Sequence, residues 1–134
     1  MEYKYFFITF VPHIKPNIMK RNKIIFYVAT GLLSVLLLFS VSQYFLKYDD
    51  IANAFESFGY PTYIIYPYAI AKLLGLLVLW LPGYKTLKEW AYAGFTFGFI
   101  FAFFAHFMIG DGEQMGAVIA TVLLVVSYIY SKKI

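Results

Sequence analysis

Apolar residues occur along the chain in four runs, each about as long as a membrane-spanning helix. Crossing about 30 Å of hydrocarbon takes roughly 20 helical residues, and short polar segments separate the runs. A backbone that faces lipid must satisfy its own hydrogen bonds, and the alternation typical of barrel strands is absent, so we expect helices. The predicted spans cover residues 23–46, 63–81, 90–109 and 115–130.

Between the first two spans, the segment YDDIANAFESFGYP has the periodicity of a short amphipathic helix. Asp49 or Asp50 would cap its start, and Gly59 followed by Pro61 would end it. We expect this helix to lie on the membrane surface with its phenylalanines toward the bilayer, and a plain surface loop is the alternative. The apolar positions that set the period are Ile51, Ala54, Phe55 and Phe58.

Composition assigns the chain to the membrane proteins. Of its 134 residues, 62% are hydrophobic and only 13% are charged, and a soluble domain of this size could not bury that much apolar surface. The predicted fold class is therefore an all-α membrane protein, an antiparallel four-transmembrane-helix bundle with a short interfacial helix. The absence of cysteine excludes disulfides and thiolate chemistry. The net charge of +4 is too small for a nucleic-acid partner, so the expected surroundings are a lipid bilayer.

The basic residues predict which way the bundle faces. Lysine and arginine near span ends are retained in the cytoplasm, whereas the segments after spans one and three are mainly acidic. We therefore expect a multi-pass protein of the cell (inner) membrane with both termini cytoplasmic, which agrees with an even number of spans. The basic residues on the predicted cytoplasmic side are Lys15, Lys20, Arg21, Lys23, Lys85, Lys88, Lys132 and Lys133.

Residues 1–18 form a separate N-terminal extension in this interpretation. The segment is interrupted by Pro12 and Pro16 and is too short to span a bilayer. It is either a short interfacial segment or the product of a mis-assigned start, because Met19 opens a basic stretch that runs directly into the first span. Residues 19–134 then form the membrane domain, with span one as an uncleaved anchor.

Small residues indicate where membrane helices approach one another. In span three, Gly94, Gly98 and Ala102 recur every four residues, and the next position on this stripe is His106. In span two, Gly75 shares a face with Lys72. The residues of spans one and four that we expect in the same interior are Ser34, Leu38, Ser42, Gly116, Ala120 and Ser127.

Four polar residues are candidates for a ligand pocket in the outer half of the bundle: Lys72, His106, Gln43 and Asp111. Tyr66 lies at the outer membrane interface in this interpretation, and a rise of about 1.5 Å per residue places Lys72 roughly 9 Å below it. The same rise places His106 and Gln43 near the outer ends of their spans. Each has a simpler interpretation. Lys72 could extend to the headgroups, His106 could serve only as a hydrogen-bond donor between helices, and Gln43 could be interfacial.

Catalytic and metal chemistry lack a pattern in the sequence. His13 lies in the extension, no HxxxH or ExxH spacing is present, and there is no nucleophile motif, phosphate loop or cofactor fingerprint. We therefore predict no metal ligands and name no catalytic residue. The sequence does not decide whether the protein is an enzyme, but it favours a chain without autonomous catalytic activity.

The run KEWAYAGF at the start of span three, together with AHFMIGDG at its end, resembles the DoxX-like family of small bacterial membrane proteins. The turn GYP and the lysine and glycine of span two support the resemblance, which covers about residues 19–134. It implies a four-span antiparallel bundle. Relatives include a quinone-linked thiosulfate oxidoreductase subunit and, more distantly, membrane chaperones, but the missing cysteines separate this chain from thiol-handling relatives. The family pattern falls on Lys88, Glu89, Trp90, Gly94, His106 and Asp111.

Two functions remain open at this stage. In the first, an outward-facing pocket binds a small polar ligand or a quinone in a redox-accessory role, and the quinone rests on family analogy alone. In the second, the protein is a non-catalytic assembly, scaffold or chaperone module whose aromatic faces dock a membrane protein or a second copy of itself. A transporter is disfavoured, because four spans show no inverted repeat or broken helix pair.

Overall fold

The computed structural model describes residues 15–134, and in this part of the chain the only regular elements are helices. Four of them are long and apolar enough to cross a membrane, which confirms the predicted four-helix bundle. Residues 1–14 of the predicted extension lie outside the described residues. The elements are α2 (Lys15–Leu46), α3 (Tyr48–Phe58), the 3₁₀ turn η2 (Thr62–Ile64), α4 (Ile65–Trp80), α5 (Lys85–Ile109) and α6 (Gln114–Ser131).

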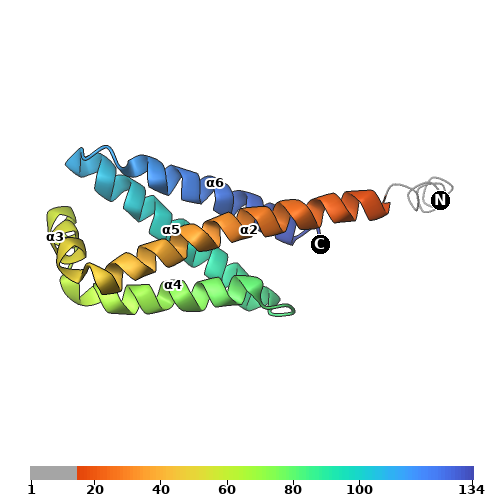
Figure 1. Cartoon of the computed structure of the whole chain (residues 1–134), viewed down its shortest axis with the longest axis horizontal. Helices are drawn as coiled ribbons and strands as arrows, with labels where there is room; N and C mark the ends of the chain where they lie inside the picture. Colours follow the sequence, from red (N-terminus) through yellow and green to blue (C-terminus); the bar gives the residue numbers. More distant parts are fainter. Residues whose placement is uncertain (1–14) are drawn as a thin grey trace.

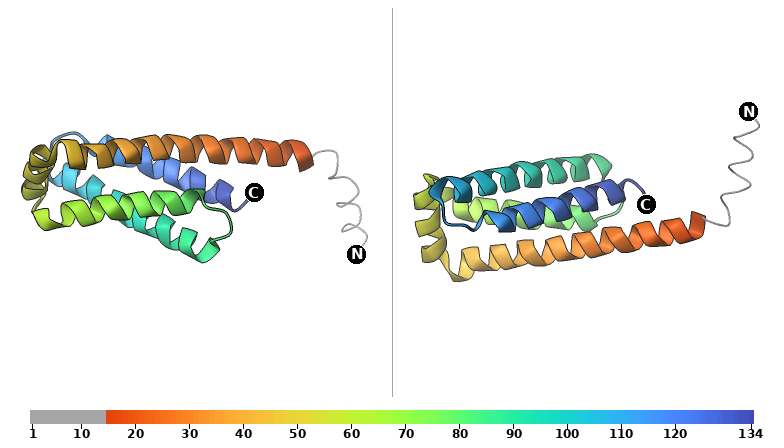
Figure 2. Two further views of the ribbon diagram at one scale, coloured as in Figure 1. Left: turned by 60° about the horizontal axis from the view of Figure 1, so that its bottom comes forward. Right: turned by 90° about the horizontal axis from the view of Figure 1, so that it is seen from above.

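The long helices surround one core in the order α2, α4, α5, α6, so each contacts two neighbours. Figure 1 and Figure 2 show α3 lying across one end of the bundle, where it contacts α2 and α5. We call this the α3 end. The opposite end holds the start of α2, the α4–α5 connection and the end of α6, and we call it the terminal end.

Two helices begin several residues before the predicted spans. The first begins at Lys15 rather than Lys23 and runs across the expected boundary at residue 18, and the third begins at Lys85 rather than Trp90. Pro16 does not interrupt α2, because a proline in the first helical turn gives up an N–H group that has no partner there anyway. The extra residues, 15–22 and 85–89, contain several lysines and an arginine. Each of these helices therefore extends beyond its apolar segment.

The amphipathic segment after span one is a helix, as predicted, but its start differs from the expectation. The residue that precedes α3 is Lys47, which makes no side-chain capping bond, whereas Asp49 and Asp50 lie within the first turn. Carboxylates at these positions favour the positive end of the helix dipole without capping it. At the other end Gly59 has a φ of 81°, and the Tyr60 N–H donates to the carbonyl of Phe55 over 2.9 Å.

Hydrogen bonds between side chains connect all four long helices, and those made by Ser127 are buried. Ser127 of α6 is fully buried, and its Oγ lies 2.6 Å from Thr30 Oγ1 of α2 and 2.7 Å from Tyr92 Oη of α5. One turn along α2 from Thr30, Ser34 Oγ accepts the Trp80 indole N–H of α4 over 2.9 Å, and this contact is partly buried. Ser34 and Ser127 therefore occupy the predicted interior.

Leu38, which we expected on the same interior face as Ser34, is instead 51% exposed. The buried stripe of α2 follows Thr30, Leu33, Leu37 and Val41, with steps of three and four residues. Repeated steps of four from Ser34 drift off this stripe, because a helix turns once every 3.6 residues. Leu38 therefore faces outward.

The small residues predicted at helix contacts differ in what surrounds them. A Cβ added at Gly75 would lie 2.8 Å from Phe95 Cζ, and one at Gly98 would lie 2.7 Å from Tyr68 Oη. Gly94 has no such neighbour within 4 Å. Ala102, on the same helix, is half-buried. The close approaches therefore involve Gly75 and Gly98.

Replacing Gly75 and Gly94 by alanine should have opposite effects. Gly75→Ala should lower the free energy of unfolding by about 1–2 kcal/mol, because the buried Phe95 ring must move. Gly94→Ala should be neutral or slightly stabilising, since it adds helix propensity and meets nothing. Reversible unfolding in mixed detergent micelles measures both. Equal changes in the free energy of unfolding for the two variants would contradict the close approach of Gly75 to Phe95.

Ser127→Ala should destabilise the bundle by about 1–2 kcal/mol, because the hydroxyl groups of Thr30 and Tyr92 lose their common partner in the core. The control is Ser42→Ala on α2, where the hydroxyl donates to the backbone carbonyl of Phe39 in its own helix. That variant should remain within about 0.5 kcal/mol of the wild type. If Ser127→Ala lowered the free energy of unfolding no more than the control does, the hydrogen bonds of Ser127 to Thr30 and Tyr92 would not be stabilising.

Candidate functional site

A cavity of about 350 Å³ lies at the α3 end between α3, α4 and α5, and we call it the aromatic cavity. Its walls are almost entirely apolar, and His106 supplies an imidazole. The size is within the range of roughly 300–1,000 Å³ that is usual for small-molecule sites. The lining residues are Tyr44, Phe55, Phe58, Tyr60, Ile64, Tyr68, Gly98, Phe101, Ala102, Ala105 and His106.

Local sequence features explain why these aromatic groups meet. The left-handed Gly59 reverses the chain after α3, so that Tyr60 packs its ring edge-on against Phe55 and Phe58 at centroid distances of 6.2 and 6.1 Å. The missing side chain of Gly98 leaves room for the Tyr68 hydroxyl against α5. Two glycines therefore shape the cavity.

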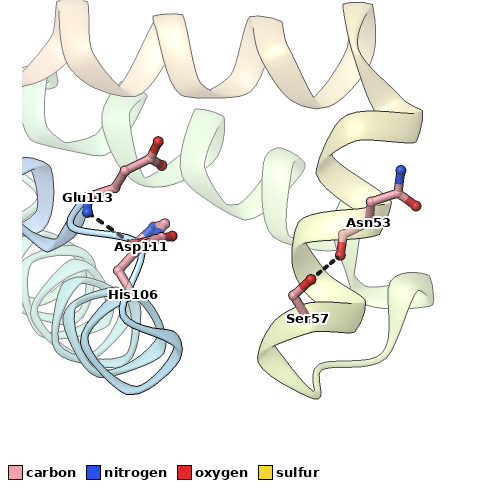
Figure 3. A network of polar contacts seen from close by, with 5 residues as sticks. All are labelled: Asn53, Ser57, His106, Asp111 and Glu113. Carbon is pink, nitrogen blue, oxygen red and sulfur yellow. Dashed lines mark hydrogen bonds and ion pairs between the residues drawn. The ribbon is translucent and has the colours of Figure 1, made fainter.

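His106 is held by the loop that follows its own helix. Its Nδ1 lies 2.7 Å from Asp111 Oδ2, while Asp111 Oδ1 accepts the backbone N–H of Glu113 over 2.9 Å. Gly110 and Gly112 have φ values of 71° and 77° and bend the chain back toward the histidine. Figure 3 shows these groups together, whereas the hydrogen bond of Ser57 to Asn53 lies apart on α3.

This arrangement has two chemical consequences. An N–H at Nδ1 of His106 donates to Asp111, which leaves Nε2 for another partner. The Phe58 ring packs edge-on against the imidazole at 5.0 Å and orients it further. The pKa of the Asp111 carboxyl is lowered, first by the Glu113 N–H and then by the hydrogen bond to His106.

Lys72 points into the bundle rather than to the headgroups. The residue is only 8% exposed, and its Nζ donates to Ser40 Oγ over 2.8 Å and to Tyr44 Oη over 3.2 Å. The ammonium group also lies 4.4 Å from the ring centroid of Tyr44 and 4.6 Å from that of Tyr68, within cation–π range. Lys72 does not line the aromatic cavity, but both of these tyrosines do.

The four sequence-predicted pocket residues therefore occupy three places. His106 and Asp111 are paired, and Lys72 lies behind two tyrosines of the wall. Gln43 is half-buried, does not line the cavity, and its side chain makes no hydrogen bond within residues 15–134. Its backbone carbonyl accepts the N–H of Lys47.

Sequence reasoning missed Ser40, Tyr44 and Tyr68. A tyrosine so near a span end is typical of the membrane interface, but the tertiary structure buries Tyr44. The spacing did contain a signal, because Leu33, Leu37, Ser40 and Tyr44 follow one helical stripe with steps of three and four residues.

One group in the described part of the chain has the composition of a metal site. His106, Asp111 and Glu113 offer ligand atoms within 4.8 Å of one another. Both carboxylate residues are exposed, and the Nδ1 of the histidine is occupied by Asp111. Exposed acidic groups commonly gather in this way without a metal, so we assign none.

The carboxyl group of Asp111 should titrate below the ordinary aspartate pKa of 3.8. Ionised Asp111 therefore stabilises the fold above that pH, and the contribution is lost as the pH falls through the lower folded-state pKa. His106→Phe should return the pKa only part of the way, because the Glu113 N–H remains and is the larger cause. Carboxyl ¹³C NMR measures this pKa. Ser57→Ala is the control that should leave it unchanged, and a full return to 3.8 in His106→Phe would contradict the assignment.

Comparison with known proteins gives one family. The model of the DoxX-like family matches residues 28–129, which covers the greater part of α2, the whole of α3, α4 and α5, and most of α6. No curated protein and no solved structure matches the chain. The match extends over well more than half of the 134 residues, and the four long apolar helices agree with it. The chain is a multi-pass membrane protein that belongs to the DoxX-like family.

Proposed function

We propose that this membrane protein binds a small, flat and largely apolar molecule with a carbonyl group, such as a quinone, in the aromatic cavity. The observation that carries the proposal is the position of His106, an imidazole held by Asp111 in a wall built mainly from aromatic and small residues. Aromatic rings favour stacked or edge-on contacts with a flat ring. One placed hydrogen-bonding group then orients the ligand.

His106 is the group that would meet the ligand oxygen. With Nδ1 facing Asp111, the Nε2 atom accepts a proton or, when the ring is protonated, donates one to a carbonyl oxygen. In a redox-accessory role, a partner protein would supply electrons to the bound quinone and His106 would supply a proton to the reduced oxygen. The hydrogen bond to Asp111 holds the imidazole ring in a fixed orientation for this exchange.

Lys72 has an indirect part in this proposal. Tyr44 Oη accepts a hydrogen bond from the ammonium group, so Lys72 positions a tyrosine that lines the cavity. The same ammonium group lies against the rings of Tyr44 and Tyr68 and holds two walls in place. Direct binding of an anion to Lys72 is disfavoured, since the side chain is buried and does not line the cavity.

We infer the orientation in the membrane from the distribution of basic residues. If the terminal end faces the cytoplasm, as the excess of lysine there indicates, the aromatic cavity lies on the outer side of a bacterial inner membrane. A quinone diffusing in the bilayer would then reach the cavity from the outer leaflet.

Addition of decylubiquinone should raise the unfolding temperature of the purified protein in detergent. At a concentration about 100 times the dissociation constant, the stabilisation would be about 2.7 kcal/mol. Ala102→Phe should abolish the shift by filling the cavity, and His106→Phe should weaken binding about 10-fold through loss of one hydrogen bond. Circular dichroism during heating measures the shift.

The matched control is Ala71→Phe, the same substitution on the exposed face of α4. It should retain the full response to the quinone. A response that Ala102→Phe leaves intact would place the ligand elsewhere and overturn the proposal. No response of the wild type to decylubiquinone would favour the alternative function, a non-catalytic assembly, scaffold or chaperone module.

A further inference from the structure

A second and larger cavity lies at the terminal end, away from the aromatic cavity. Its volume is about 530 Å³, and its walls come from α2, the α4–α5 connection, the first turns of α5 and the end of α6. We call it the lysine cavity, because four lysines line it: Lys23, Lys85, Lys88 and Lys132.

The charges around this cavity are unbalanced. Lys132 forms an ion pair with Glu89, whose second carboxylate oxygen accepts the Tyr128 hydroxyl over 3.0 Å. Lys23, Lys85 and Lys88 form no ion pair with any residue in the described range 15–134. Like charges brought together without partners repel one another, and an anion in the cavity would remove that repulsion.

The floor of the cavity is aromatic and apolar. Trp80 stacks on Tyr27 with centroids 6.0 Å apart and an interplanar angle of 15°, and the side chain of Leu79 beside them is buried. The hydrogen bond of the Trp80 indole to Ser34 fixes this ring on α2. Tryptophan and tyrosine are the residues that membrane proteins place at headgroup level. The cavity therefore joins a cationic rim to an apolar floor at the membrane–water interface.

We propose that the lysine cavity binds the phosphate group of an anionic phospholipid such as phosphatidylglycerol. The ammonium groups of Lys23, Lys85 and Lys88 would donate to the phosphate oxygens, and the apolar part of the lipid would lie against Tyr27 and Trp80. Basic cavities between membrane helices accept lipid headgroups of this kind. A soluble anion would use the cationic rim but not the floor. The inference concerns the opposite end of the bundle and does not depend on the proposed function of the aromatic cavity.

The test measures retention of phosphatidylglycerol by native mass spectrometry of the whole protein. The protein is extracted from nanodiscs that contain phosphatidylcholine and phosphatidylglycerol in equal amounts. Wild type should keep phosphatidylglycerol in preference to phosphatidylcholine. The double variant Lys85→Gln with Lys88→Gln should lose that preference, with affinity lowered on the order of 30-fold for two lysines near the surface.

A matched control removes the same charge from the same end of the bundle. Lys20→Gln with Lys133→Gln alters two lysines outside the cavity lining and should keep the preference. Equal losses in the two double variants would reduce the effect to general attraction by the leaflet and would overturn the proposed site. Unfolding temperatures in phosphatidylcholine alone should be equal for the two variants, which shows that both fold.

A third measurement distinguishes the lipid from a soluble ligand with the same phosphate chemistry. Inorganic phosphate added to the detergent-solubilised protein should leave the unfolding temperature unchanged, whereas short-chain phosphatidylglycerol should raise it. A shift of the same size with inorganic phosphate would overturn the lipid assignment and identify the cavity as a site for free anions.

Discussion

The hydrogen bonds of Ser127 are the interaction on which the rest of the bundle depends. Helices in a bilayer gain little from hydrophobic burial against one another, so close packing and a few interior polar contacts determine how each helix is rotated. One hydroxyl group meets Thr30 of α2 and Tyr92 of α5, while Ser34 binds Trp80 of α4. With these contacts made, the rotation of all four helices about their axes is set. The rotation of the helices in turn decides which side chains line the two cavities.

The two ends of the bundle offer different chemistry. At the α3 end, a short amphipathic helix covers the core and encloses a cavity with aromatic walls and one histidine. At the terminal end no comparable helix is present within the described residues, and a larger cavity is rimmed by lysines. An apolar ligand with a carbonyl group suits the first cavity and an anionic headgroup suits the second, because each matches the charge and polarity of its walls.

The candidate site was predicted in part. Steps of four residues along span three lead to His106, which lines the aromatic cavity. The GDG sequence after it brings Asp111 within 2.7 Å, because two glycines with positive φ bend the loop back. The pattern could not give the partners of Lys72. Whether that side chain meets Ser40 and Tyr44, the headgroups or His106 depends on which helix lies beside α4, and local spacing does not contain this information.

By itself, the sequence determined that the chain forms four apolar helices and an amphipathic one. Run length, periodicity and the stop at Gly59 are local properties that a lipid environment converts directly into helices. Only the tertiary structure decided that Leu38 faces outward while Tyr44 is buried, and that lysines from three distant segments surround one cavity. The physical reason is that a helix presents every side of its surface to a possible neighbour. The side that becomes interior is selected by the other three helices, through packing and the hydrogen bonds that meet at Ser127.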